Sequence, residues 1–179
     1  YQEHGVTPSP KMAGLMAAAI LSDTVMFKSP TCTKKDIAMA ERLARIARIS
    51  LKDLGRELFS STSDGKSAEE LLGTDYKEFH ISGQTIGVGQ ITCVDSSKLV
   101  ERRDEFIAAM EKVKQNSNCD LVILMITDVL LDGSHIFYVG SDDVMQEAFS
   151  TVPKDKHMFL PKVMSRKKQI IPMLTAMWG

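Results

Sequence analysis

The sequence lacks the long apolar run that a membrane-spanning helix requires. Such a helix needs about 18 or more consecutive apolar residues, whereas the longest apolar stretches here are interrupted by Asp, Lys or Ser. An excess of positive charge is also missing, because 22 Lys and Arg stand against 23 Asp and Glu, for a formal net charge of −1. We therefore expect no membrane partner and no broad nucleic-acid surface held by phosphate attraction. Any anion-binding site must be a local cluster of cations.

Cysteine is scarce, and neither the histidines nor the glycines form a known ligand motif. Cys32, Cys93 and Cys119 are odd in number and far apart, which fits neither a disulfide framework nor a Cys-x-x-Cys zinc site. Reduced thiols in a cytoplasm are the simpler interpretation. The four histidines share no ligand spacing. The segment 87–89, Gly-Val-Gly, lacks the third glycine and the following helix of a dinucleotide-binding loop.

Length and composition indicate a folded chain. With 179 residues, of which 44% are hydrophobic and 25% charged, the sequence is close to the globular average. It is long enough for one ordinary domain, or for a small domain with a fragment attached. The chain opens at Tyr1 without Met or a signal peptide and reaches a turn-like segment, 5–10, almost at once. We therefore expect a piece of a longer protein.

The N-terminal third carries helical patterns. Residues 11–21 are rich in Ala, Leu and Met, and Pro10 suits a first helical turn. Because this segment is apolar nearly all round, we expect a buried helix. Thr33 is a candidate N-cap for a second helix with one apolar face, and Ser50 can cap a third.

A polar segment then predicts a domain boundary. Residues 60–66 contain no apolar side chain and are mostly small, which suits a flexible linker. We therefore expect the chain to divide into residues 1–59 and 67–179.

Strand and helix patterns alternate after this boundary. Ser67 and Glu70 are spaced as a capping box, and Ser141 is a candidate N-cap for a later helix. Gly87 and Gly89 weaken one strand or mark a bulge in it. The expected strands are 77–81, 84–94, 121–127, 136–139 and 158–160, and the expected helices 96–116, 141–149 and 172–178. This alternation predicts an α/β domain with a mixed β-sheet flanked by helices.

Asp23 closes the first helical pattern. A carboxylate at the end of an apolar helix costs free energy unless it is solvated, hydrogen-bonded or bound to a metal. It could ligate a hard divalent cation such as Mn²⁺ or Mg²⁺. The alternative is a surface carboxylate, although the C-terminal end of a helix is the unfavourable end for an anion. Spacing alone leaves both interpretations open.

A basic segment, residues 165–169 (Ser-Arg-Lys-Lys-Gln), is the second candidate, with Lys162 just before it. Arg166 offers a fork of donors that matches two phosphate oxygens, while Lys167 acts as a point charge. The segment could hold a phosphate or be a solvated basic loop. If it is extended, Lys168 points away from the phosphate, because neighbouring side chains alternate.

Other polar positions are weaker candidates. Lys77, taken alone, is a charged residue on the solvated face of a strand. Thr127 and Asp128 end an apolar strand and could form a polar site, but a turn-forming Asp is the favoured interpretation.

Together these segments resemble a known enzyme family. Residues 13–16 (Ala-Gly-Leu-Met), 19–24 (Ala-Ile-Leu-Ser-Asp-Thr) and 27–33 (Phe-Lys-Ser-Pro-Thr-Cys-Thr) resemble the last part of the DHH domain in family II inorganic pyrophosphatases. Residues 165–172 (Ser-Arg-Lys-Lys-Gln-Ile-Ile-Pro) are similar to the signature near the C-terminus of the same enzymes. The order and separation of the motifs also fit, and the likeness covers essentially the whole chain.

The resemblance implies a domain plan and a metal ligand. Residues 1–59 would be the helical tail of the DHH metal-binding domain, and 60–66 the linker. Residues 67–179 would be the DHH-associated C-terminal domain, and the family's active site lies in the cleft between the two domains. By position, Asp23 would ligate one of two catalytic manganese ions, with Mg²⁺ as the alternative metal.

The resemblance also implies the substrate contacts. Arg166 and Lys167 would bind pyrophosphate and neutralise charge during catalysis, and Lys77 would bind it from another element. The full-length protein would be a cytoplasmic homodimer. The His and Asp ligands of the family's N-terminal motifs, including the Asp-His-His stretch, are absent from this sequence. Because one carboxylate cannot hold two metal ions, we expect the 179-residue piece to be inactive alone.

Two alternatives remain open. An exopolyphosphatase of the same superfamily would differ in preferring long polyphosphate over pyrophosphate. A non-catalytic anion-binding or assembly module would hold the anion without hydrolysing it. Nuclease members of the superfamily fit less well, because the Gly-Gly-rich nucleic-acid motif of their C-terminal domain is missing.

Overall fold

The computed structural model describes residues 5–60 and 65–178. The chain divides into two compact units, Tyr1–Ser61 and Thr62–Gly179. Residues 61–64, the greater part of the predicted linker, lie outside the described residues. Among the helices that are described, none is long and apolar enough to cross a membrane.

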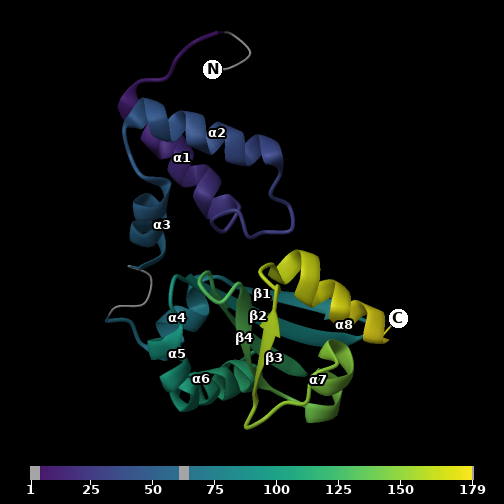
Figure 1. Ribbon diagram of the computed structural model, residues 1–179. Helices are drawn as coiled ribbons and strands as arrows, with labels where there is room; N and C mark the ends of the chain where they lie inside the picture. The colour runs from purple at the N-terminus through teal and green to yellow at the C-terminus, as the bar shows by residue number, and fades with distance from the viewer. Residues whose placement is uncertain (1–4, 61–64, 179) are drawn as a thin grey trace. The chain divides into compact units, whose positions relative to one another are not determined.

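The first unit contains the helices α1 (Pro10–Asp23), α2 (Lys34–Ala47) and α3 (Leu51–Ser60) (Figure 1). The side chain of Thr33 accepts a hydrogen bond from the backbone N–H of Asp36, and Asp36 accepts one in return from the N–H of Thr33. This capping box confirms the predicted start of α2. The small core of the unit includes Ala13 and Ala17 of α1 and Leu43 of α2.

The prediction that the first helix is buried all round is wrong within this unit. Leu15 of α1 is 61% exposed, and Met12 is 40% exposed. The buried positions of α1 are its small residues Ala13 and Ala17, together with Leu21. Among the described elements of this unit, α2 and α3 pack against α1, and two helices cover only part of its surface.

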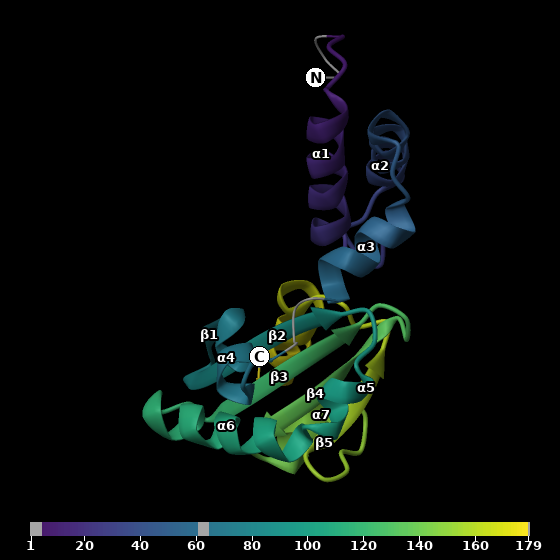
Figure 2. The same cartoon turned by 90° about the vertical axis from the view of Figure 1, so that its left-hand side faces the viewer.

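The second unit is built on a five-stranded mixed sheet. Its strands lie side by side in sequence order (Figure 2). They are β1 (Tyr76–Ile81), β2 (Gln84–Cys93), β3 (Leu121–Asp128), β4 (Gly133–Val139) and β5 (His157–Pro161). Strands β2 and β3 are parallel, and the other neighbours are antiparallel. A parallel pair needs a long crossover, and the helical segment between β2 and β3 supplies it. The predicted α/β fold with a mixed sheet is confirmed.

Helices cover both faces of this sheet (Figure 1). On one face lie α4 (Ala68–Thr74), α5 (Ser97–Glu101) and α6 (Arg103–Asn116). On the other lie α7 (Asp142–Phe149), the π-helical turn η1 (Arg166–Ile170) and α8 (Ile171–Trp178). Every residue of β3 is buried, as its continuous apolar run predicts. Burial on both faces stabilises the sheet by about 25 cal/mol for each Å² of apolar surface removed from water.

One local prediction for the second unit is wrong, and one of the two alternatives for the glycines of β2 is excluded. The helix expected at 96–116 is interrupted at Arg102, whose backbone N–H bonds to the carbonyl of Leu99 in a tighter turn. The register of β2 is also continuous, without a bulge at its glycines. Gly87 instead makes room for a neighbouring ring, since a Cβ there would lie 1.8 Å from the Tyr76 hydroxyl oxygen.

Candidate functional site

The basic loop, residues 162–170, connects β5 to α8 and is closed by its own glutamine. The Oε1 atom of Gln169 accepts hydrogen bonds from the backbone N–H groups of Met164 and Ser165 at 2.8 and 3.0 Å. Its Nε2 atom donates to the carbonyl of Lys162 at 2.9 Å. The side chain of Gln169 therefore fixes the backbone of the loop at residues 162, 164 and 165.

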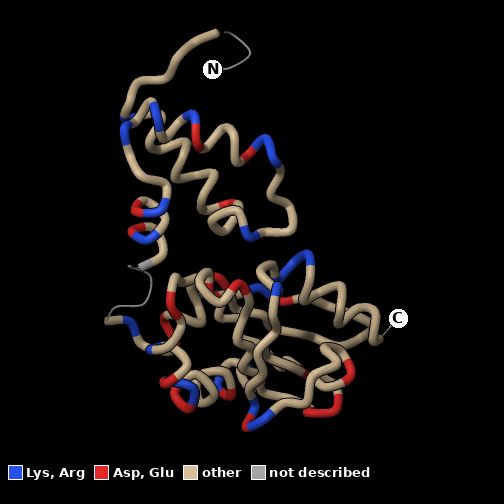
Figure 3. Tube along the Cα trace, in the orientation of Figure 1, with Lys and Arg blue, Asp and Glu red and all other residues tan. Residues whose placement is uncertain are grey.

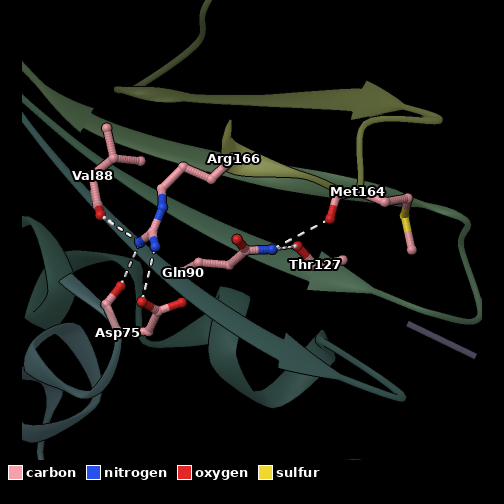
Figure 4. Close-up of polar contacts among 6 residues, drawn as sticks. All are labelled: Asp75, Val88, Gln90, Thr127, Met164 and Arg166. Atoms are coloured by element: carbon pink, nitrogen blue, oxygen red, sulfur yellow. Dashed lines mark hydrogen bonds and ion pairs between the residues drawn. The ribbon is translucent and has the colours of Figure 1, made fainter. Parts of the chain in front are cut away.

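A row of polar side chains on three adjacent strands holds this loop against the sheet, and Figure 4 shows two of them, Gln90 and Thr127. Gln90 of β2 donates from Nε2 to the carbonyl of Met164 at 3.3 Å and to the hydroxyl of Thr127 at 3.1 Å. Ser134 of β4 donates to the carbonyl of Val163 at 2.6 Å. Thr127 and Ser134 are fully buried. Since a buried polar group without a partner is costly, these bonds favour one position of the loop.

Gln90 and Ser134 were not predicted from the sequence, whereas the 127–128 segment was predicted to form either a polar site or a turn. Thr127 belongs to the polar row. Asp128 accepts a hydrogen bond from the backbone N–H of Leu131 at 2.8 Å, which confirms its predicted role in the turn. The signal for Gln90 was a polar residue where the alternation of Ile86 and Val88 predicts a core position.

Arg166 begins η1 and is buried, with its side chain 8% exposed. Its Nη1 atom donates to the carbonyls of Asp75 and Val88 at 2.7 and 2.9 Å. Its Nη2 atom donates to the carboxylate of Asp75 at 2.9 Å (Figure 4). A buried guanidinium requires such partners. Arg166 thus joins the basic loop to the end of α4 and to β2.

Lys77, Lys167 and Lys168 are exposed, and none forms an ion pair within the described part of the chain. Lys167 and Lys168 directly follow Arg166, and Figure 3 shows basic positions just before α8. Lys77 lies opposite Val88 in the β1–β2 register, and the Val88 carbonyl is the one that Arg166 contacts. The structure therefore brings the predicted residues of the second unit, Lys77, Arg166 and Lys167, to one corner of the sheet.

The condition under which Lys168 would point away, an extended segment, is not met. Residues 166–170 form a helical turn, in which the backbone N–H of Ile170 bonds to the Ser165 carbonyl at 3.4 Å. Consecutive side chains on a helical turn do not alternate between two faces, so the argument that separated Lys168 from Lys167 does not apply. Lys162 differs from both, because its ammonium group pairs with Asp132.

Asp23 is the last residue of α1 in the first unit, and its side chain is exposed. The next residue, Thr24, is buried and donates from its hydroxyl to the Ile20 carbonyl at 2.6 Å. Val25, Met26 and Phe27 then have φ values of 49°, 51° and 68°. Left-handed backbone is unfavourable for such side chains, above all for the β-branched Val25. Strain of this kind is concentrated at functional sites, which favours a role for the turn that follows Asp23.

Asp23 does not complete a metal site by itself. Within the described residues there is no group of three or more His, Cys, Asp or Glu side chains that could hold a metal ion. Mn²⁺ prefers several oxygen or imidazole ligands at once. The described residues therefore do not fit a two-manganese centre, and Asp23 can supply one ligand of such a centre.

Comparison with known proteins gives one family model and a set of related enzymes, two of which are described here. The family model described as DHHA2 domain matches residues 56–177. A manganese-dependent inorganic pyrophosphatase from Methanothrix thermoacetophila is 42% identical over 97% of this chain and 58% of its own length. A cobalt-dependent inorganic pyrophosphatase from Clostridium perfringens is 39% identical over 97% of this chain and 32% of its own length.

A solved structure agrees with these sequences. The crystal structure described as that of a family II inorganic pyrophosphatase from Methanococcus jannaschii has a TM-score of 0.84 and 35% identity, and covers 97% of this chain. This chain covers 57% of that structure and 58% of the Methanothrix relative, and thus spans little more than half the length of these two proteins. These matches confirm the resemblance drawn from the sequence motifs.

Proposed function

Because the chain belongs to the DHHA2 domain family, we propose that it is the substrate-binding part of a manganese-dependent inorganic pyrophosphatase. Residues 67–179 would bind pyrophosphate, 60–66 would link the two parts, and residues 1–59 would complete the metal-binding part. The relatives' names support this activity. The complete protein would hydrolyse pyrophosphate to two phosphates.

One structural observation carries the proposal. Two exposed lysines, Lys77 and Lys167, form no ion pair with any residue that the structure describes, and they lie with Arg166 at a corner where hydrogen bonds fix the loop. Cations placed in advance can neutralise the charge on the transferred phosphoryl group and on the leaving phosphate without reorganising during the reaction. Each lysine would act as a point charge, whereas Arg166 would offer the directed donors of its guanidinium.

Asp23 would act separately, as one ligand of a manganese ion. Within the described part of the chain its carboxylate forms no hydrogen bond or ion pair, and it precedes a strained turn. The family resemblance also implies a homodimer and a cytoplasmic location for the complete protein. Size-exclusion chromatography and cell fractionation would test these two points.

The proposal can be tested with the chain alone and with a fused protein. The fusion would place the segment of the Methanothrix relative that precedes its match ahead of residue 1 of this chain. We expect Mn²⁺-dependent release of phosphate from pyrophosphate by the fusion, and only background release by the 179-residue chain in millimolar Mn²⁺. Faster turnover of long polyphosphate than of pyrophosphate would indicate an exopolyphosphatase. Binding of pyrophosphate without turnover by the fusion would indicate a non-catalytic module.

A further inference from the structure

The carboxylate of Asp75 accepts a hydrogen bond from a donor of Arg166 that a phosphate could also use. Of the two terminal nitrogens of the guanidinium, Nη1 is engaged by two backbone carbonyls, those of Asp75 and Val88. The other, Nη2, donates to the Asp75 side chain at 2.9 Å. A predicted phosphate ligand thus already has an anionic partner.

The two kinds of contact have different roles. The carbonyls belong to main chain that other bonds fix, since the Asp75 carbonyl also accepts from the backbone N–H of Gln90 at 3.0 Å. They hold Arg166 in place whatever side chain stands at position 75. The carboxylate contributes charge to the pair, and unlike the carbonyls it can be exchanged.

Exposure indicates which partner can move. The Arg166 side chain is 8% exposed, whereas the Asp75 side chain is 47% exposed. Asp75 follows α4 and precedes β1, and Lys77 stands two residues farther along the same strand edge. The solvent side of the ion pair is therefore its carboxylate.

A carboxylate and a phosphate present the same kind of acceptor oxygens to a guanidinium. We propose that Asp75 is an internal competitor for Arg166, whose carboxylate leaves Nη2 when a phosphate oxygen of pyrophosphate takes its place. This inference rests on the proposed function of the basic loop. It explains how an arginine with a buried side chain can contact substrate: the carbonyls keep the guanidinium in position while its exposed anionic partner is exchanged.

If this exchange takes place, removal of the Asp75 carboxylate should tighten the binding of pyrophosphate, although Asp75 contacts a side chain that binds substrate. An ion pair with a half-exposed partner is worth up to about 1 kcal/mol, or about fivefold in affinity. Asp75→Asn keeps the shape and removes the charge, so it should tighten pyrophosphate binding by up to about fivefold. Asp75→Ser, too short to reach Nη2, should act in the same direction.

The test is calorimetric titration of the 179-residue chain with pyrophosphate in metal-free buffer. Glu69→Gln is the matched control, because Glu69 lies on α4, is 55% exposed and pairs with Lys112 rather than with the loop. We expect tighter binding for both Asp75 variants, no change for Glu69→Gln and weaker binding for Lys167→Ala. Thermal unfolding would establish that each variant is folded.

Each other outcome has a defined meaning. Unchanged or weaker binding by the Asp75 variants, with Lys167→Ala still weakened, overturns the competitor role and leaves the proposed function standing. Equal tightening by Glu69→Gln also overturns it, because the effect would then be one of net charge. If Lys167→Ala has no effect, or the unmodified chain binds no pyrophosphate, both the proposed function of the loop and the competitor role fail.

Discussion

The guanidinium of Arg166 donates a hydrogen bond from Nη1 to the backbone carbonyl of Val88 at 2.9 Å. Val88 lies opposite Lys77 in the β1–β2 register, so this bond ties the buried cation of the loop to the strand pair that carries an exposed one. Because the acceptor is main chain, substitution of the lysines does not remove this anchor. The effects of such substitutions on binding can therefore be interpreted as effects of charge.

Lys167→Ala should lower kcat/KM for pyrophosphate on the order of tenfold in the fused protein. The reason is that a hydrogen bond to a charged group is worth about 1.5–3 kcal/mol, and about 1.4 kcal/mol corresponds to a factor of ten. Lys162→Ala is the matched control from the same loop, because its ammonium group already pairs with Asp132. Steady-state kinetics on both variants provide the measurement. Equal effects would indicate that the loop acts only through its general charge.

Ser134→Ala should destabilise the second unit by about 1–3 kcal/mol, since it leaves the buried Val163 carbonyl without its hydrogen-bond donor. Urea unfolding followed by Trp178 fluorescence would measure this loss, because Trp178 is the single Trp of the sequence and lies in α8. The control is Thr175→Ala, which removes an exposed hydroxyl from α8, the helix that carries Trp178. It should change the free energy of unfolding by less than about 0.5 kcal/mol. A similar loss for both variants would argue against a specific role for Ser134.

The parts of the fold that depend on local chemistry could be predicted from the sequence. The capping boxes at Thr33 and Ser67 and the N-cap at Ser141 bond to residues three positions away. The helix break at Arg102 was not predictable in the same way, because nothing in the apolar spacing of 96–116 marks it. Nor was the role of Gly87, whose missing Cβ accommodates the ring of Tyr76 from the neighbouring strand.

The cations of the candidate site could be predicted from the sequence, whereas the residues that hold the loop in place could not. The basic segment stands out because its charges are adjacent in sequence. The burial of Arg166 could not be predicted in this way, because its partner Asp75 is 91 residues away in the chain. Gln90 and Ser134 are single polar residues in apolar strands, and only the face each occupies reveals that it contacts the loop.

Asp23→Asn in the fused protein should weaken Mn²⁺ affinity and lower activity, with partial recovery at high Mn²⁺. The substitution keeps the shape but removes the charge that holds a hard cation. Asp53→Asn, at an exposed position in α3 of the same unit, should leave Mn²⁺ affinity unchanged. Metal titration by calorimetry would compare the two. Unchanged stoichiometry and affinity in Asp23→Asn would show that Asp23 is not a ligand.

Two histidines of adjacent strands provide the basis for a prediction about pH. Nδ1 of His135 and Nε2 of His157 lie 2.8 Å apart, so one ring must donate while the other accepts. Burial lowers the pKa of His135, against an opposing effect of the Asp128 carboxylate. Burial, with the nearby His135 and Arg103, lowers the pKa of His157. The folded pair therefore resists protonation more than free histidines do.

A pKa that is lower in the folded state means that the unfolded chain binds more protons, so the free energy of unfolding falls as the pH decreases. This contribution is complete above the ordinary His pKa of about 6.5 and is lost as the pH falls through the lower folded values. Double protonation would also place two cations in contact and disrupt the hydrogen bond between the rings. We expect the free energy of unfolding of the second unit, followed by Trp178 fluorescence in urea, to decrease from about pH 7 to about pH 5, with a slope of up to about 1.4 kcal/mol per pH unit for each proton. His157→Gln should reduce this slope, whereas His80→Gln, at an exposed position of β1, should retain it. An unchanged slope in His157→Gln would place the pH dependence in other groups.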